Sequence, residues 1–227
     1  MSTDSYSIRP IFWLKHPVSG LLHLLGFFLS VTGLVWLLIR SEEKNTAEYF
    51  LSAYTFSISM ALLYLSSASY HLLKVSERLT KCLRRIDHSM IFIFIAGTCT
   101  PFCISFPSLI TKCFAVALIW AIALAGIFFS IFVSTGSRWI RVGSYLTMGG
   151  VGTFLAIQIH TLLSPGSFRW IIFGGVAYVV GSFVYAFKWP NPAPKYFGFH
   201  EIWHIFVLLG SACHFWAVAL HLTGAFV

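Results

Sequence analysis

Seven apolar stretches, each about long enough to cross a lipid bilayer, constrain this chain more than any other feature. A transmembrane helix needs roughly 20 apolar residues to cross about 30 Å of hydrocarbon. We therefore predict an all-α fold, a polytopic membrane protein built as a seven-transmembrane-helix bundle. The predicted spans lie near residues 21–39, 50–73, 87–106, 112–133, 140–163, 168–187 and 200–222.

The composition agrees with this prediction and leaves little room for soluble structure. The chain is 58% hydrophobic and only 10% charged, whereas soluble domains are nearer about 25% charged. The connections are short, so residues 21–227 are predicted to form one membrane domain after a tail at 1–20. This tail has no small-residue cleavage site, and the first span is too long for a signal peptide, so we expect that span to remain as a helix.

The distribution of Lys and Arg predicts the orientation of the chain. The formal net charge is +8, but the basic residues lie mostly between spans, where topology explains them better than a nucleic-acid partner does. Eleven fall on one side and four on the other, which places the N-terminus in the cytoplasm and the C-terminus outside. The first set is Arg9, Lys15, Lys74, Arg78, Lys81, Arg84, Arg85, Arg138, Arg141, Lys188 and Lys195; the second is Arg40, Lys44, Lys112 and Arg169.

Small residues and prolines give three further expectations. The five cysteines are scattered without a CxxC pair, so no disulfide framework is predicted. The glycines at 149, 150, 152, 174 and 175 are interpreted as close helix packing. Three prolines in the 188–198 linker predict a firm break before the last span.

Ionisable side chains within spans are costly, and several fall at the same predicted depth. His71 ends the second span, Asp87 begins the third, and His200 and His204 stand four residues apart at the start of the seventh. Three imidazoles and one water make up a catalytic zinc site. We therefore predict Zn²⁺ held by His71, His200 and His204, with Asp87 as the base that deprotonates the water. Ser67, one turn before His71, is placed to hydrogen-bond the water, a ligand or a substrate carbonyl, or to support a ligand.

Other interpretations of these residues remain open at this point. An interfacial histidine is often only hydrogen-bonded, and Asp87 could pair with Arg84 or Arg85. The stretch HEIWH at 200–204 also fits the zinc metalloprotease pattern, in which the glutamate, here Glu201, is the general base. No third ligand of that family is found for such a protease. His214 lies about 20 Å deeper than His200, and His23, His160 and His221 have no partner that the sequence identifies.

Three motifs resemble the hemolysin III family, the bacterial branch of the progestin and adipoQ receptor superfamily, which is similar to alkaline ceramidases. They are SSASYH at 66–71, IDH at 86–88 with AGTCTPF at 96–102, and HEIWH at 200–204 with GSACHF at 210–215. The resemblance implies seven helices, a cytoplasmic N-terminus and a zinc ion on His71, His200 and His204. It also implies an aspartate, Asp87, that contacts the metal through water, with Ser67 beside the site.

The chain departs from this family pattern in two places. Residues 15–20, KHPVSG, stand where members often carry an acidic run. The family does not require a glutamate after the first histidine of the last span, so Glu201 is expected to be incidental and to point away from the metal.

The expected function is zinc-dependent hydrolysis of a lipid amide or ester at the cytoplasmic side of a bacterial plasma (inner) membrane. One alternative is a non-catalytic sensor or regulator of membrane state with structural zinc. The other is a cytolytic hemolysin, which no amphipathic, secretable segment supports. The lipid bilayer and a lipid substrate or ligand are the expected partners.

Overall fold

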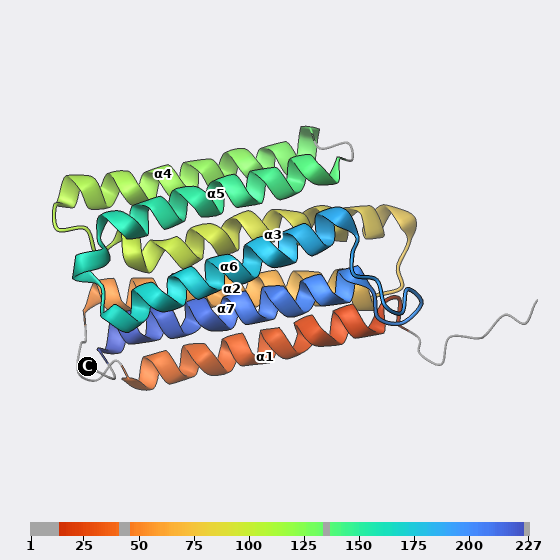
Figure 1. The fold of residues 1–227 in the computed structure, drawn as a ribbon, viewed down its shortest axis with the longest axis horizontal. Helices are drawn as coiled ribbons and strands as arrows, with labels where there is room; N and C mark the ends of the chain where they lie inside the picture. The colour runs from red at the N-terminus through yellow and green to blue at the C-terminus, as the bar shows by residue number, and fades with distance from the viewer. Residues whose placement is uncertain (1–13, 41–45, 134–136, 225–227) are drawn as a thin grey trace, which may run out of the picture.

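The computed structural model describes residues 14–40, 46–133 and 137–224, and these residues form helices without a strand among them. Seven α-helices are long and apolar enough to cross a membrane, so the predicted all-α seven-helix bundle is confirmed (Figure 1). They are α1 (Pro17–Ile39), α2 (Ala47–Leu72), α3 (Glu77–Cys103), α4 (Leu109–Phe128), α5 (Arg138–Gln158), α6 (Pro165–Phe187) and α7 (Phe199–Thr223). A π-helical turn, η2 (Phe129–Val133), continues α4, and a 3₁₀ turn, η3 (His160–Leu162), follows α5.

The third helix begins ten residues earlier than the predicted span. The residues before Asp87 were expected to form a loop, but α3 starts at Glu77, and the Ser76 side chain caps it by accepting a hydrogen bond from the Leu79 amide. Charged residues are good helix formers, so hydropathy marks only the membrane-embedded part of this helix. Asp87 therefore lies well inside α3, and Arg84 lies one turn before it.

The other boundaries follow local signals. The helix α1 begins at Pro17, four residues before the predicted start, because proline suits the first helical turn. The α-helical part of α5 ends at Gln158, five residues before the predicted end at 163. The predicted break at 188–198 is confirmed: Lys188 ends α6 in the left-handed region with φ 57°.

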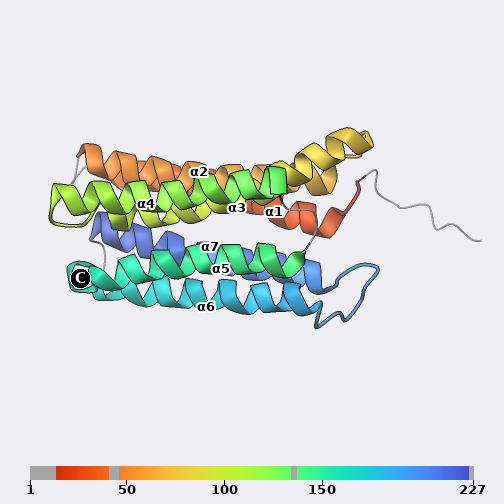
Figure 2. The same cartoon turned by 90° about the horizontal axis from the view of Figure 1, so that it is seen from above.

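The helices form two layers, which Figure 2 shows from above. The helices α1, α2, α3 and α4 lie in one layer, and α5, α6 and α7 lie in the other. Consecutive helices pack against each other, and α7 closes the bundle against α1 while α3 contacts α5 across the layers. This places the N-terminal part of α7 beside α1 and the C-terminal part of α2.

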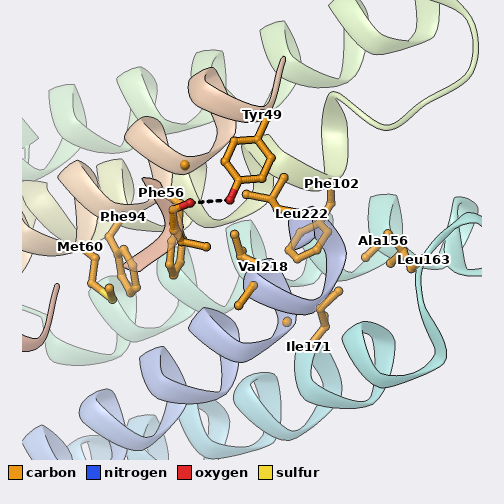
Figure 3. Close-up of a cluster of buried hydrophobic side chains, with 14 of the residues drawn as sticks. Tyr49, Phe56, Met60, Phe94, Phe102, Ala156, Leu163, Ile171, Val218 and Leu222 are labelled. Carbon is orange, nitrogen blue, oxygen red and sulfur yellow. Dashed lines mark hydrogen bonds between the residues drawn. The ribbon is translucent and has the colours of Figure 1, made fainter. Parts of the chain in front are cut away.

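The main hydrophobic core fills one end of the bundle. It contains Phe56 and Val218, both fully buried, among a larger group of apolar side chains (Figure 3). The Tyr49 hydroxyl donates a hydrogen bond to the Leu37 carbonyl, 2.6 Å away, and so ties α1 to α2 within this core. The opposite end of the bundle contains the histidines.

Basic side chains collect at the histidine end. The start of α1, the α2–α3 connection, the start of α5 and the 188–198 linker all lie at this end (Figure 1). Of the fifteen Lys and Arg residues, Arg9 and Lys44 lie outside the described residues. The described ones divide between the ends as seven crossings require, while the side of the membrane that each end faces stays a prediction.

Candidate metal centre

Three histidines from two helices converge at this end of the bundle. His71, in the last turn of α2, meets His200 and His204 from the first turns of α7, and we call these three the histidine triad. The Nε2 atom of His200 lies 3.4 Å from Nε2 of His71 and 3.1 Å from Nε2 of His204. His71 and His204 are buried, at 3% and 1% exposure.

The triad has the dimensions of a tetrahedral metal site. Zinc–nitrogen bonds of about 2.0–2.1 Å put two nitrogen ligands of a tetrahedral ion about 3.3–3.4 Å apart. One ligand atom from each histidine lies within 4.8 Å of the other two. The residues therefore fit a metal ion held by three imidazoles, and the triad can hold one.

A fourth histidine supports the triad from α1. Nε2 of His23 is hydrogen-bonded to Nδ1 of His204, and the two ring centroids lie 3.9 Å apart. When Nδ1 of His204 carries the hydrogen, its Nε2 keeps the lone pair that a metal ligand needs. No partner for His23 was predicted from the sequence. Its position inside an apolar span was the available signal, but its partner lies 181 residues away in the sequence.

Glu201 ties α1 to α7 and is not incidental. One carboxylate oxygen accepts a hydrogen bond from the Ser19 hydroxyl at 2.7 Å, and the other accepts one from the Gly198 amide at 2.9 Å. The second bond caps the first turn of α7, where an acidic side chain also suits the helix dipole. Nearby, the His16 amide donates to the His71 carbonyl at 2.8 Å, which fixes the start of α1 beside the triad.

Asp87 and Ser67 lie together beside the triad. The Ser67 hydroxyl interacts with the Asp87 carboxylate, and Ser67 is buried on α2, one turn from His71. Asp87 makes no ion pair with Arg84 or Arg85 within the described part of the chain, contrary to that alternative. Nδ1 of His88 lies 3.9 Å from the Asp87 carboxylate.

Two cavities open from this region. The first, which we call the polar cavity, has a volume of about 570 Å³ and is bordered by His71, His200 and Asp87. The second, the apolar cavity, has a volume of about 630 Å³ and is bordered mainly by aliphatic and aromatic residues of α3, α5, α6 and α7. Five residues border both cavities: Asp87, Ile91, Tyr145, Ser182 and Trp203. The two cavities therefore meet at Asp87.

Glycines shape the apolar cavity, and the packing interpretation is wrong for three of them. A Cβ atom at Gly149, Gly150 or Gly175 would meet nothing within 4 Å, and all three border the apolar cavity. The packing interpretation holds for Gly152 and Gly174, where a Cβ would collide with Cys99 and His214 respectively. Absent side chains on α5 and α6 thus create space.

The remaining histidines and the cysteines lie outside the triad. His214 is buried, its Nδ1 donates to the Gly210 carbonyl at 2.8 Å, and it borders the apolar cavity. His160 bonds the Ile157 carbonyl, and His221 bonds the Ser105 hydroxyl. All five cysteines are free, as predicted.

Comparison with known proteins gives the same family that the motifs resemble. The model of the haemolysin-III related family matches residues 12–215. A hemolysin-3 homolog of Bacillus subtilis (strain 168) is 35% identical over 214 residues, covering 93% of this chain and 96% of that protein. Hemolysin-3 of Bacillus cereus is 31% identical over 205 residues, covering 89% and 90%. The progestin and adipoQ receptor-like protein 1 of Caenorhabditis elegans is 24% identical, covering 91% of this chain and 52% of that protein. The chain belongs to the haemolysin-III related family of multi-pass membrane proteins.

Proposed function

We propose that this protein is a zinc-dependent hydrolase of a lipid amide or ester, resident in a bacterial inner membrane. The observation that carries the proposal is the histidine triad, of which His71 and His200 border a cavity that Asp87 also borders. A structural zinc ion is normally enclosed by four protein ligands, whereas a catalytic one has three and keeps one position open. Three imidazoles beside a cavity therefore favour catalysis over a purely structural metal.

The chemistry of the donor set favours zinc. Imidazole nitrogens suit zinc, and the nitrogen separations in the triad fit its tetrahedral geometry. Zinc bound there would polarise a substrate carbonyl and lower the pKa of a water molecule toward about 7.

Asp87 and Ser67 supply the protein's part in the reaction. In the proposed mechanism, Asp87 accepts a proton from the water that attacks the carbonyl carbon. When the bond to the leaving amine or alcohol breaks, Asp87 returns that proton to the leaving group. Ser67, which interacts with the Asp87 carboxylate, would orient that carboxylate in this mechanism. His23 holds the His204 ring in place through Nδ1.

The apolar cavity fits the acyl chain of such a substrate. It extends from Asp87 between helices that carry lipid-facing residues, and glycines keep it open. An acyl chain placed there would bring its carbonyl carbon to the junction of the two cavities.

The metal assignment is tested by metal content. We expect purified wild-type protein to contain zinc and His71→Ala to lose it, because two imidazoles and a water hold zinc far more weakly than three. His160→Ala is the matched control, since His160 is exposed and bonds only a backbone carbonyl among the described contacts. Elemental analysis measures both. Equal zinc in wild type and His71→Ala, or none in either, would refute the site.

The support from His23 is tested by zinc affinity. We expect His23→Ala to weaken zinc binding by about 10- to 100-fold, as loss of an outer hydrogen-bond partner does at other zinc sites. The His23→Gln variant should recover part of the affinity, because its amide oxygen can accept from Nδ1 of His204. Competition with a chelator measures all three proteins. Unchanged affinity in His23→Ala would show that the contact does not orient the ligand.

The role of Asp87 is tested by separating turnover from metal binding. We expect Asp87→Asn to keep its zinc and to lose at least about 100-fold of its acyl-hydrolase rate, the size of a general-base contribution. Glu201→Gln should keep most of the rate, because its amide oxygen can still accept from the Gly198 amide while its NH₂ group donates to the Ser19 hydroxyl. Fatty acid release from acyl amides and esters, followed by mass spectrometry, measures the rate. If Glu201→Gln lost the rate and Asp87→Asn kept it, Glu201 would be the base instead.

The acyl-chain site is tested by filling the apolar cavity. We expect Gly149→Leu to lower hydrolysis of long-chain lipids at least about tenfold without loss of zinc, since the new side chain occupies the space of several methylenes. Gly143→Leu is the matched control: it lies on the same helix with nothing within 4 Å of its Cβ position, but it does not border the cavity. Equal rates in the two variants would place the acyl chain elsewhere.

A further inference from the structure

We propose that the polar cavity binds the phosphate headgroup of an acyl lipid, through Arg84 of α3 and Arg141 of α5; this inference rests on the hydrolase function proposed above. Both arginines border the polar cavity from opposite helices. A guanidinium group presents a rigid fork of donors that matches phosphate oxygens. The substrate class is then an acyl ester or amide that carries a phosphate.

The two arginines lack an acidic partner in the described structure. No hydrogen bond or ion pair engages either guanidinium group there, and Nε of Arg141 is shielded from solvent without a partner. Arg84 is exposed at the mouth of the cavity, whereas Nε of Arg141 is a buried charged donor, which is costly without an acceptor. An anion in the cavity would provide that acceptor.

The acidic groups that border the same cavity are already engaged. Both oxygens of Glu201 accept hydrogen bonds, from Ser19 and Gly198, and the Asp87 carboxylate interacts with the Ser67 hydroxyl. Neither carboxylate lies within ion-pair distance of Arg84 or Arg141. The cationic character of the cavity wall is therefore not neutralised by its own carboxylates.

The neighbouring Arg138 does have partners, so the lack of partners is particular to Arg84 and Arg141. Arg138, one turn before Arg141, donates to the carbonyls of Tyr185 and Ala186 at 3.2 and 3.3 Å and lies over the Tyr185 ring. Arg138 thus caps the C-terminal carbonyls of α6.

The order of residues along α3 and α5 matches the order of groups in such a lipid. On α3, Arg84 comes first, Asp87 follows one turn deeper, and Ile91 follows another turn deeper. On α5 the same order is Arg141, Tyr145 and Gly149. Residues three or four apart share a helix face and are separated by about 5 Å along the axis. A phosphate at the arginines would thus place the acyl linkage near Asp87 and the chain in the apolar cavity.

Binding is the decisive measurement, because it does not depend on turnover. The probes are a monoacylglycerol and the corresponding lysophosphatidic acid, which share one acyl ester and differ in the phosphate. Purified zinc-loaded protein carrying Asp87→Asn is used in uncharged detergent, so that the ligand is not consumed and the micelle does not attract the basic end. We expect the phosphate lipid to bind at least about tenfold more tightly than the neutral one.

The arginine variants then locate this preference. We expect Arg84→Gln or Arg141→Gln, added to that background, to bring the ratio of the two affinities close to one. Arg85→Gln is the matched control: it removes the same charge from the next position of α3 but does not border the cavity. It should leave the ratio unchanged. A ratio near one before any arginine is changed, or an equal loss in all three variants, would overturn the headgroup site.

Two further experiments separate a lipid headgroup from a free anion, and the headgroup site from the hydrolase function. Inorganic phosphate that displaces the phosphate lipid at concentrations near the dissociation constant of the lipid would make a free anion the occupant and overturn the lipid assignment. Wild-type protein that hydrolyses neither probe, while the preference and its loss in the arginine variants hold, would refute the proposed hydrolase and leave the headgroup site standing. Hydrolysis of the neutral probe without any binding preference would do the opposite.

Discussion

Imidazole nitrogens buried in an apolar bundle need partners, and this requirement organises one whole end of the molecule. The Nε2 atoms of the triad lie at separations expected between nitrogen ligands of one metal ion. The position of each histidine depends on a different part of the chain. Helix α2 must end near His71, α7 must begin just before His200, and α1 must bring His23 against His204. The hydrogen bond from the Ser19 hydroxyl to the Glu201 carboxylate then fixes the position of α1 along α7. A shift of any of these helix ends would move one of the triad histidines or His23 away from its partners.

The sequence predicted the parts of this site that depend on spacing within one helix. His200 and His204 share a face because they are four residues apart, and the matching ends of the spans brought His71 to the same depth. Hydropathy likewise located all seven helices, but it missed the first turns of α3, which are helical and charged. Those turns matter because they place Arg84 on the face that leads to Asp87.

The parts that the sequence did not predict depend on contacts between distant segments. His23 sits in an ordinary apolar span, and only the packing of α1 against α7 gives it a partner. Glu201 fits a catalytic motif, yet its oxygens are taken by a backbone amide and by Ser19. Glycine in a membrane helix usually indicates close packing, and nothing local distinguishes Gly149, which borders a cavity, from Gly152, which packs against Cys99.

Polarity changes along the bundle axis in a way that packing alone does not require. The main hydrophobic core lies toward the far end, and the apolar cavity reaches it: Leu63, Phe94, Phe102, Ala156 and Ile171 of this core border the cavity. A cavity in a membrane bundle costs stability through lost contacts, and the buried Nε of Arg141 at the polar cavity adds a desolvation cost. Both costs fall along one path, from Arg84 and Arg141 past Asp87 to Gly149. An amphiphile with an anionic end, a reactive linkage and an apolar chain would offset all of them at once, whereas a simple ion or a fully apolar ligand would offset only one.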